Sequence, residues 1–135
     1  MSELPVRRPH RTLETEPFWD GCAARRIVLP QCNACDEVIW YPRRFCPFCG
    51  SRDVRWEEMS GRGTIYSFTV IRKGPGPYRE HSPYVVAYVE LDEGPRLLTN
   101  VVDVPIDQVE VGQAVRVVFD AVPDSDDALP RFAPA

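Results

Sequence analysis

Four of the five cysteines in this chain of 135 residues lie in two close pairs, and this spacing restricts the fold more than any other feature. Cys32 and Cys35 form the first C-x-x-C pair, and Cys46 and Cys49 form the second after ten intervening residues. A C-x-x-C turn can present two thiolates to one ion, and tetrahedral Zn²⁺ takes four such ligands at about 2.3 Å. Two pairs joined by a short hairpin predict a zinc ribbon with rubredoxin-like knuckles. Short strands are expected beside the pairs, over residues 27–29 and 38–41.

The predicted ion is one structural Zn²⁺, because four thiolates fill its coordination sphere and leave no position for water or substrate. Its binding is expected to contribute on the order of 10 kcal/mol to folding. Iron bound as in rubredoxin and oxidised thiols remain the alternatives. Gly50 follows the second pair, where such knuckles commonly need a positive φ. Asp36 occupies the matching position of the first pair and adopts that conformation less readily.

The segment before the ribbon predicts a helix of about ten residues that begins near Thr15. Thr15 supplies an N-cap hydroxyl, and Glu16 and Pro17 suit the first turn. A helix this short must dock on another surface, and it carries an apolar stripe for that purpose, made of Phe18, Trp19, Cys22 and Ala23. We interpret Phe18 and Trp19 as core residues, with anchoring of a partner as the alternative. Cys22 is interpreted as a buried apolar side chain rather than a nucleophile.

The chain favours strands over helices, since Val and Ile together number 22 against seven Leu. Apolar runs bounded by turns predict five strands, over residues 64–72, 84–91, 96–102, 114–122 and 129–132. In the fourth strand, Val115, Val117, Phe119 and Ala121 are expected on one face, with Arg116 and Asp120 on the other. A helical turn over residues 105–109 completes the outline of a small five-stranded OB-fold barrel.

We therefore expect a mostly β fold in three parts. A flexible arm covers residues 1–14, a short N-terminal helix and the zinc ribbon cover residues 15–58, and the OB-fold covers residues 59–135.

The charge of the chain is unevenly distributed around a net value of −4. Residues 63–135 hold six basic and eleven acidic side chains, and this negative half argues against a nucleic-acid partner. No stretch approaches the ~18 apolar residues of a membrane span, and the N-terminus lacks the apolar core of a signal peptide. We therefore expect a cytoplasmic protein without a membrane partner, in a compartment whose reducing conditions favour metal binding over disulfides.

Few other residues suggest chemistry. The loop over residues 72–84 is long for a connection between two strands, and such loops often bind ligands, so Tyr78 and His81 are candidates for contact with a partner or substrate. Arg43, Arg44 and Phe45 lie between the cysteine pairs and are further candidates, because arginines pair with phosphates and partner surfaces. No residue is assigned a catalytic role, since the chain has no nucleophile elbow, P-loop or dinucleotide fingerprint.

Several segments that occur in a fixed order resemble a known family. Besides the cysteine pairs, they are Pro17-Phe18-Trp19, Ser60–Ser67, Pro83–Leu91, Gly94–Asn100 and Leu129-Pro130-Arg131-Phe132. The set covers residues 15–134 and is similar to the family of zinc-ribbon plus OB-fold proteins associated with acyl-CoA metabolism, long classed as a domain of unknown function. The family motif identifies no catalytic residues, so the resemblance carries over only the four zinc cysteines.

The resemblance implies a non-catalytic accessory subunit that forms a hetero-oligomer with a thiolase-fold enzyme and is required for its activity. That partner is a thiolase, another acyltransferase, or a retro-aldolase like the one whose complex cleaves a steroid-CoA ester in bacterial steroid side-chain degradation. An acyl-CoA is then expected at or near the interface. We expect the loop over residues 72–84 and the adjoining OB-fold strands to complete the partner's active-site tunnel. The chain is expected to be a free-standing subunit or an excised domain.

Three other classes of protein compete with this interpretation. A single-stranded nucleic-acid-binding OB-fold module is the main alternative, with stacking platforms at Tyr66, Phe68, Tyr84 and Tyr88. An electron-transfer protein would hold iron in the four-cysteine site and absorb visible light. An independent enzyme would depend on His81 as its base.

Overall fold

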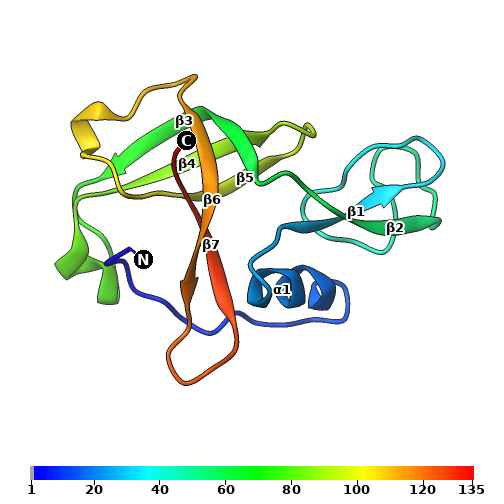
Figure 1. Ribbon diagram of the computed structural model, residues 1–135, viewed down its shortest axis with the longest axis horizontal. Coiled ribbons are helices and arrows are strands. Elements are labelled where there is room, and N and C mark those ends of the chain that lie inside the picture. Colours follow the sequence, from blue (N-terminus) through cyan, green and yellow to red (C-terminus); the bar gives the residue numbers. More distant parts are fainter. Residues whose placement is uncertain (1) are drawn as a thin grey trace.

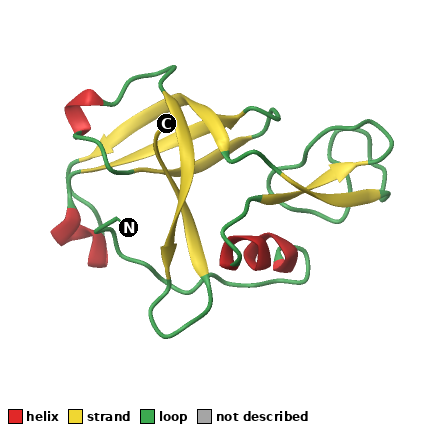
Figure 2. Cartoon of the chain, in the orientation of Figure 1, coloured by secondary structure: helices red, strands yellow, loops and turns green. Residues whose placement is uncertain are grey.

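The structure is a computed structural model that describes residues 2–135, and its strands form a two-stranded ribbon and a five-stranded barrel (Figure 1, Figure 2). Helix α1 spans Glu16–Ala23, followed by β1 (Val28–Cys32) and β2 (Val54–Glu58) of the ribbon. The barrel strands are β3 (Arg62–Ile71), β4 (Tyr84–Leu91), β5 (Arg96–Val101), β6 (Ala114–Ala121) and β7 (Ala128–Pro134). Two 3₁₀ segments, η1 (Gly76–His81) and η2 (Ile106–Gln108), connect barrel strands. The predicted mostly β fold with a short N-terminal helix is confirmed.

The barrel closes in the order β3-β4-β5-β7-β6. Strand β6 returns to β3 through the pairs Arg62↔Arg116 to Thr64↔Ala114, and β5 meets β7 in parallel at Val101↔Phe132. Alternate residues of the strands point inward, as a half-buried strand requires. The core therefore contains fully buried side chains from all five strands, among them Ile65, Val85, Leu97, Val115 and Phe132.

Helix α1 and the base of the ribbon share this core rather than forming one of their own. Phe18, Cys22, Ile27 and Leu29 are buried in the same hydrophobic cluster as the barrel residues. The expected start of the helix is confirmed, but Thr15 does not cap it. Its hydroxyl instead accepts a hydrogen bond from the Thr12 N–H at 3.0 Å, within the preceding turn.

The second strand of the ribbon differs from the sequence-based expectation. The apolar run Val38–Tyr41 forms only an isolated bridge between Val38 and Gln31, while β1 pairs with β2 from Val28↔Glu58 to Cys32↔Val54. The apolar character of Val38 and Ile39 reflects burial, since both are less than 10% exposed. It therefore marks a segment that packs on the main core through Val38 and inside the ribbon through Ile39, not a strand.

The N-terminal arm lies along the barrel and covers one end of β6 and β7. The Arg131 guanidinium donates to the Pro5 carbonyl at 2.8 Å, and the Ser2 N–H donates to Asp120 at 2.9 Å. Asp120 was expected on a solvent-facing side of its strand but is only 1% exposed, because the arm and Arg131 cover it. The flexibility of the arm and the boundaries after residues 14 and 58 stay predictions.

A second carboxylate ties the arm to the β6–β7 turn. Asp127 is 6% exposed and accepts hydrogen bonds from Arg11, with Arg8 at 3.5 Å. The Arg11 hydrogen bonds lower the pKa of Asp127.

No helix among residues 2–135 is long and apolar enough to cross a membrane.

The lowered pKa makes the stability of the wild type depend on pH. An unfolded Asp titrates near 4, so the contribution of Asp127 is complete above that pH and is lost as the pH falls through the lower folded pKa. We expect Asp127→Asn to remove this component of the acid-side loss. The urea unfolding midpoints of the variant and the wild type are measured from pH 6 to pH 3, and the difference between the two is compared at each pH. Effects of acid on the cysteines occur in both proteins and therefore cancel in this difference. Asp126→Asn is the control, because Asp126 is an exposed neighbour of Asp127. Identical dependence of the unfolding midpoint on pH in the two variants would contradict the prediction.

Candidate functional site

The four paired cysteines converge on one point of the ribbon. Their sulfurs all lie within 4.8 Å of one another, with 3.6 Å between Cys32 and Cys49 and 3.6 Å between Cys35 and Cys46. Four sulfurs placed about 2.3 Å from a tetrahedral ion stand roughly 3.8 Å apart. The arrangement therefore fits a structural metal site in which every ligand position is a thiolate.

The backbone of each knuckle is shaped to present its sulfurs. Gly50 has a φ of 80°, and Asp36 adopts the matching conformation with a φ of 66°. The N–H groups of Ala34 and Cys35 donate to the Cys32 sulfur at 3.3 and 3.4 Å. These donors stabilise the thiolate, and the pKa of Cys32 is lowered to about 7, chiefly by the Cys35 N–H. The first knuckle thus accommodates Asp36 where glycine is more usual.

Cys22 is separate from this site. It is fully buried in α1 within the hydrophobic core, and burial raises the pKa of its thiol to about 12. A nucleophilic cysteine needs a lowered pKa and access to substrate. The structure therefore supports the interpretation of Cys22 as a packed apolar side chain.

The other candidate residues fall into two groups far apart in the molecule. Arg43, Arg44 and Phe45 are exposed on the ribbon, where the Arg44 N–H donates to Glu14 at 3.3 Å. Tyr78 and His81 belong to η1, at the opposite end of the molecule (Figure 1). The five residues do not form one site, and their contact with a partner or substrate stays a prediction.

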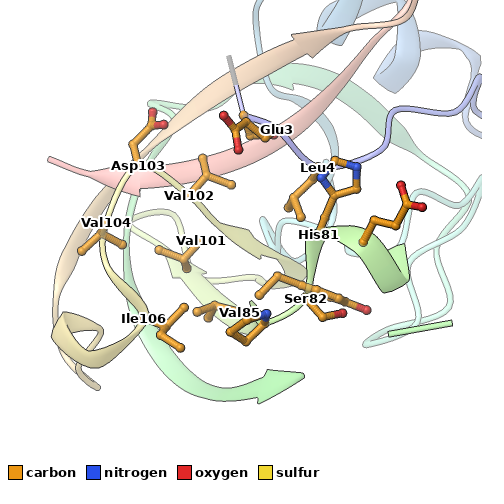
Figure 3. A pocket seen from close by; sticks show the side chains of 14 residues that line it. Glu3, Leu4, His81, Ser82, Val85, Val101, Val102, Asp103, Val104 and Ile106 are labelled. Carbon is orange, nitrogen blue, oxygen red and sulfur yellow. The ribbon is translucent and has the colours of Figure 1, made fainter. Parts of the chain in front are cut away.

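The η1 loop borders a cavity of about 620 Å³ at the end of the barrel. Its apolar side chains come from the N-terminal arm, β4, β5 and the segment after β5, with Leu4 and His81 on one side and Asp103 and Val104 on the other (Figure 3). Glu3, Glu80 and Asp103 supply its carboxylates. Tyr78 is not part of this lining and instead packs on Tyr84, with ring centroids 5.2 Å apart. The cavity thus combines apolar side chains with three carboxylates.

The four aromatic residues considered for base stacking do not form one platform. Phe68 packs against the barrel core, and Tyr84 packs on Tyr78. Tyr66 and Tyr88 remain about half exposed on the outer face of the barrel.

Sequence reasoning did not identify a groove between α1, the ribbon and the barrel. It has a volume of about 270 Å³ and is lined by Phe18, Trp19, Trp40, Tyr41, Leu98–Asn100 and Leu129–Arg131. These residues are up to 113 positions apart in the chain, so only the tertiary fold reveals the groove. The sequence contains one indication of this groove, namely the alternative interpretation of Phe18 and Trp19 as anchors for a partner.

Comparison with known proteins matches both parts of the chain. Residues 19–55 match the family described as "ChsH2, rubredoxin-like zinc ribbon domain", and residues 56–120 match "ChsH2, C-terminal OB-fold domain". The chain is 37% identical over 109 residues to a "DUF35 domain-containing scaffold protein" of Methanothermobacter thermautotrophicus, which covers 78% of this chain and 81% of that protein.

Two longer relatives are named as hydratase subunits. The "Probable enoyl-CoA hydratase alpha subunit" of Thermomonospora curvata is 42% identical over 120 residues, and the match covers 87% of this chain. The "3-oxo-4,17-pregnadiene-20-carboxyl-CoA hydratase alpha subunit" of Mycobacterium tuberculosis is 29% identical, and the match covers 88% of this chain. The chain spans only 37% and 38% of the lengths of these two proteins.

One solved structure is similar over nearly the whole fold. A chain of the "Ltp2-ChsH2(DUF35) aldolase" has 38% sequence identity and a TM-score of 0.82, and the match covers 94% of this chain and 98% of that one. Together with the matches to both domains, this similarity shows that the chain belongs to the ChsH2/DUF35 family of zinc-ribbon and OB-fold proteins.

Proposed function

We propose that this protein is an accessory subunit that binds a thiolase-fold enzyme acting on acyl-CoA esters and supplies no catalytic residue itself. The observation that carries the proposal is the similarity, across nearly all of both chains, to the ChsH2(DUF35) component named in the Ltp2 aldolase complex. Relatives named as scaffold proteins support the same role.

The ion proposed for the four-cysteine site is Zn²⁺ in a structural role. All four sulfurs are close enough to complete a tetrahedron, and the matching ribbon domain is described as a zinc ribbon. When bound, the ion would hold the two knuckles together through Cys32, Cys35, Cys46 and Cys49. The protein would then be colourless, whereas iron would give it visible absorbance.

His81 is a poor candidate for an independent general base. It is exposed at the edge of an open cavity, and among residues 2–135 no hydrogen bond orients its side chain. A general base works when its geometry relative to the substrate is fixed. This supports a division of labour in which the partner holds the reacting groups.

The proposed reaction of the partner is the cleavage of a carbon–carbon bond in a steroid or other lipid side-chain CoA ester. An aldolase complex and a pregnadiene-carboxyl-CoA hydratase subunit both contain relatives of this chain, which supports that substrate class. A thiolase or other acyltransferase is the alternative partner. Acyl-CoA would bind at or near the interface of the hetero-oligomer.

Co-purification from the native host tests the proposal. The tagged protein should retain a thiolase-fold enzyme in near-equal amount, identified by mass spectrometry. Retention of ribosomal proteins or nucleic acid in its place would overturn the proposal and favour the nucleic-acid alternative.

We expect the loop over residues 72–84 to contribute to the partner's active-site tunnel. Its acidic neighbours Glu3, Glu80 and Asp103 would repel the phosphates of CoA, so the loop is expected to face the acyl part or the partner. Deleting residues 75–81 should lower turnover by the complex at least about tenfold. His81→Ala is a milder companion variant, and unchanged zinc content and melting temperature are the controls. Full turnover and full complex formation by the deletion variant would contradict the expectation.

A further inference from the structure

The groove between α1, the ribbon and the barrel has rigid aromatic walls. The Phe18 ring lies 4.9 Å from that of Trp19 and 5.4 Å from that of Trp40, and Trp40 lies 5.0 Å from Tyr41, all in edge-to-face geometry. The Trp19 Nε1–H is buried and has no hydrogen-bond partner within residues 2–135. This donor is shielded from solvent, so the accessible wall of the groove is formed by the aromatic rings and not by the N–H group.

An apolar ladder crosses the outer face of the barrel beside this groove. Tyr88 of β4 is paired with Leu98 of β5, and Tyr66 lies at the bulge of β3 next to Ser67, which pairs with Tyr88. Tyr66, Tyr88 and Leu98 are 49%, 46% and 57% exposed. Side chains paired across antiparallel strands stand close together on one face, so Tyr88 and Leu98 adjoin. Arg96, two residues before Leu98 on the same face of β5, joins Tyr66 to them.

The ladder and the groove are parts of one surface. Leu98 belongs to both, and Trp40 of the groove also lines a shallow depression with Arg96 and Phe48, which is 65% exposed. Arg96 in turn lies over the Tyr66 ring at 3.8 Å. We call this surface, made of the groove, the ladder and Phe48, the aromatic face.

The aromatic face is large enough to form the core of an interface. Its five exposed side chains are Tyr41, Phe48, Tyr66, Tyr88 and Leu98, and each is about half exposed. Large apolar side chains bury roughly 150–250 Å² each, so these five offer on the order of 500 Å². That is most of the ~800 Å² that one partner contributes to a typical specific interface. It also matches the largest apolar patches of monomeric proteins, which are often functional.

The charges around this surface favour a protein occupant. The Arg96 guanidinium is paired with Glu90 at 2.9 Å, and Arg131 is buried with Asp120. No free cationic group on the aromatic face would attract a phosphate chain among the residues that the structure describes. Protein interface cores are likewise rich in Tyr, Trp and Phe and poor in unpaired charge.

We propose that the aromatic face is the surface on which the thiolase-fold partner docks, with an apolar side chain of the partner in the groove. This inference rests on the proposed function, because it names the surface used in that interaction. It also unites the segments that carried the family resemblance, since Phe18-Trp19, Leu97–Asn100 and Leu129–Arg131 meet at the groove or beside it.

The test uses the purified thiolase-fold enzyme that co-purifies with the full chain, and its affinity for matched variants. Leu98→Glu places a charge in the centre of the aromatic face and should weaken binding at least about 30-fold, as expected for a central interface position. Tyr88→Ala removes contact area without adding charge and should weaken binding in the same direction. Val111→Glu is the control, because Val111 is 65% exposed and lines neither the groove nor the depression. Its affinity should stay within about twofold of the wild type.

The outcomes separate this inference from the proposed function. Selective loss of binding by Leu98→Glu and Tyr88→Ala, with zinc content and melting temperature unchanged, would support it. Wild-type affinity in both variants would overturn the docking surface while leaving the accessory role intact. If the wild type binds no thiolase-fold enzyme, both proposals fail. If Leu98→Glu instead abolishes binding to a single-stranded oligonucleotide, the aromatic face is a nucleic-acid site and this inference is wrong.

Discussion

Cys46→Ser is expected to lose the metal and to unfold the ribbon. Cys46 is fully buried and packs with Cys32 and Ile39 in a small cluster that is separate from the main core. This cluster is too small to hold the two knuckles together without an ion. A structural zinc contributes on the order of 10 kcal/mol to folding, so removal of one thiolate should cost the larger part of that free energy.

Zinc content and urea unfolding of the purified variant measure this effect. Cys22→Ser is the matched control, because Cys22 is equally buried but lies outside the metal site. It should retain one equivalent of zinc and lose only about 1–3 kcal/mol for the buried hydroxyl. A Cys46→Ser variant that keeps one equivalent of zinc and a wild-type unfolding midpoint would contradict the assigned role of the four cysteines.

Asp120→Ala is expected to be the most damaging change in the barrel half. Asp120 and Arg131 are 1% and 4% exposed and meet at 3.3 Å, and Arg131 also donates to Asn100 and to the Pro5 carbonyl. Removing the carboxylate leaves the guanidinium buried without its counter-charge, which typically costs about 3–5 kcal/mol. Because Ser2 donates to the same carboxylate, the arm should also become more susceptible to proteolysis.

Chemical denaturation with two comparison variants tests this prediction. Glu58→Gln disrupts the exposed Arg26–Glu58 pair and should cost less than about 1 kcal/mol. Adding Arg131→Met to Asp120→Ala should restore part of the lost stability, because the uncompensated charge is then removed. A single Asp120→Ala variant within about 1 kcal/mol of the wild type would show that the buried pair does not stabilise the barrel.

The parts of the fold that could be predicted from the sequence depend on local patterns. The barrel strands β4 and β5 are largely apolar or β-branched runs bounded by turns, so their ranges were predicted within one residue. Strand β2 was missed because Arg55, Glu57 and Glu58 give it a polar sequence, while its pairing partner lies 22 or more positions upstream. The burial of Asp120 was missed for a similar reason, since the arm that covers it is distant in sequence.

In the candidate site, too, local motifs could be predicted from the sequence and contacts between distant segments could not. The four cysteines could be identified as one site because each pair forms a C-x-x-C motif of four consecutive residues, which is recognisable without the fold. The groove could not be identified, since α1, the ribbon, β5 and β7 each contribute only a few of its residues. By sequence alone Trp19 is interpreted as a core residue and Arg131 belongs only to the family motif, and only the fold shows that they line the same groove.

Turnover of an acyl-CoA ester by the thiolase-fold partner, with and without this protein, tests the central claim most directly. The partner enzyme, purified alone, should gain at least about tenfold in turnover when an equimolar amount of the subunit is added. The subunit alone should show no turnover. Activity of the partner that is unchanged by the subunit, or turnover by the purified subunit free of any thiolase, would contradict the assignment as a non-catalytic accessory subunit.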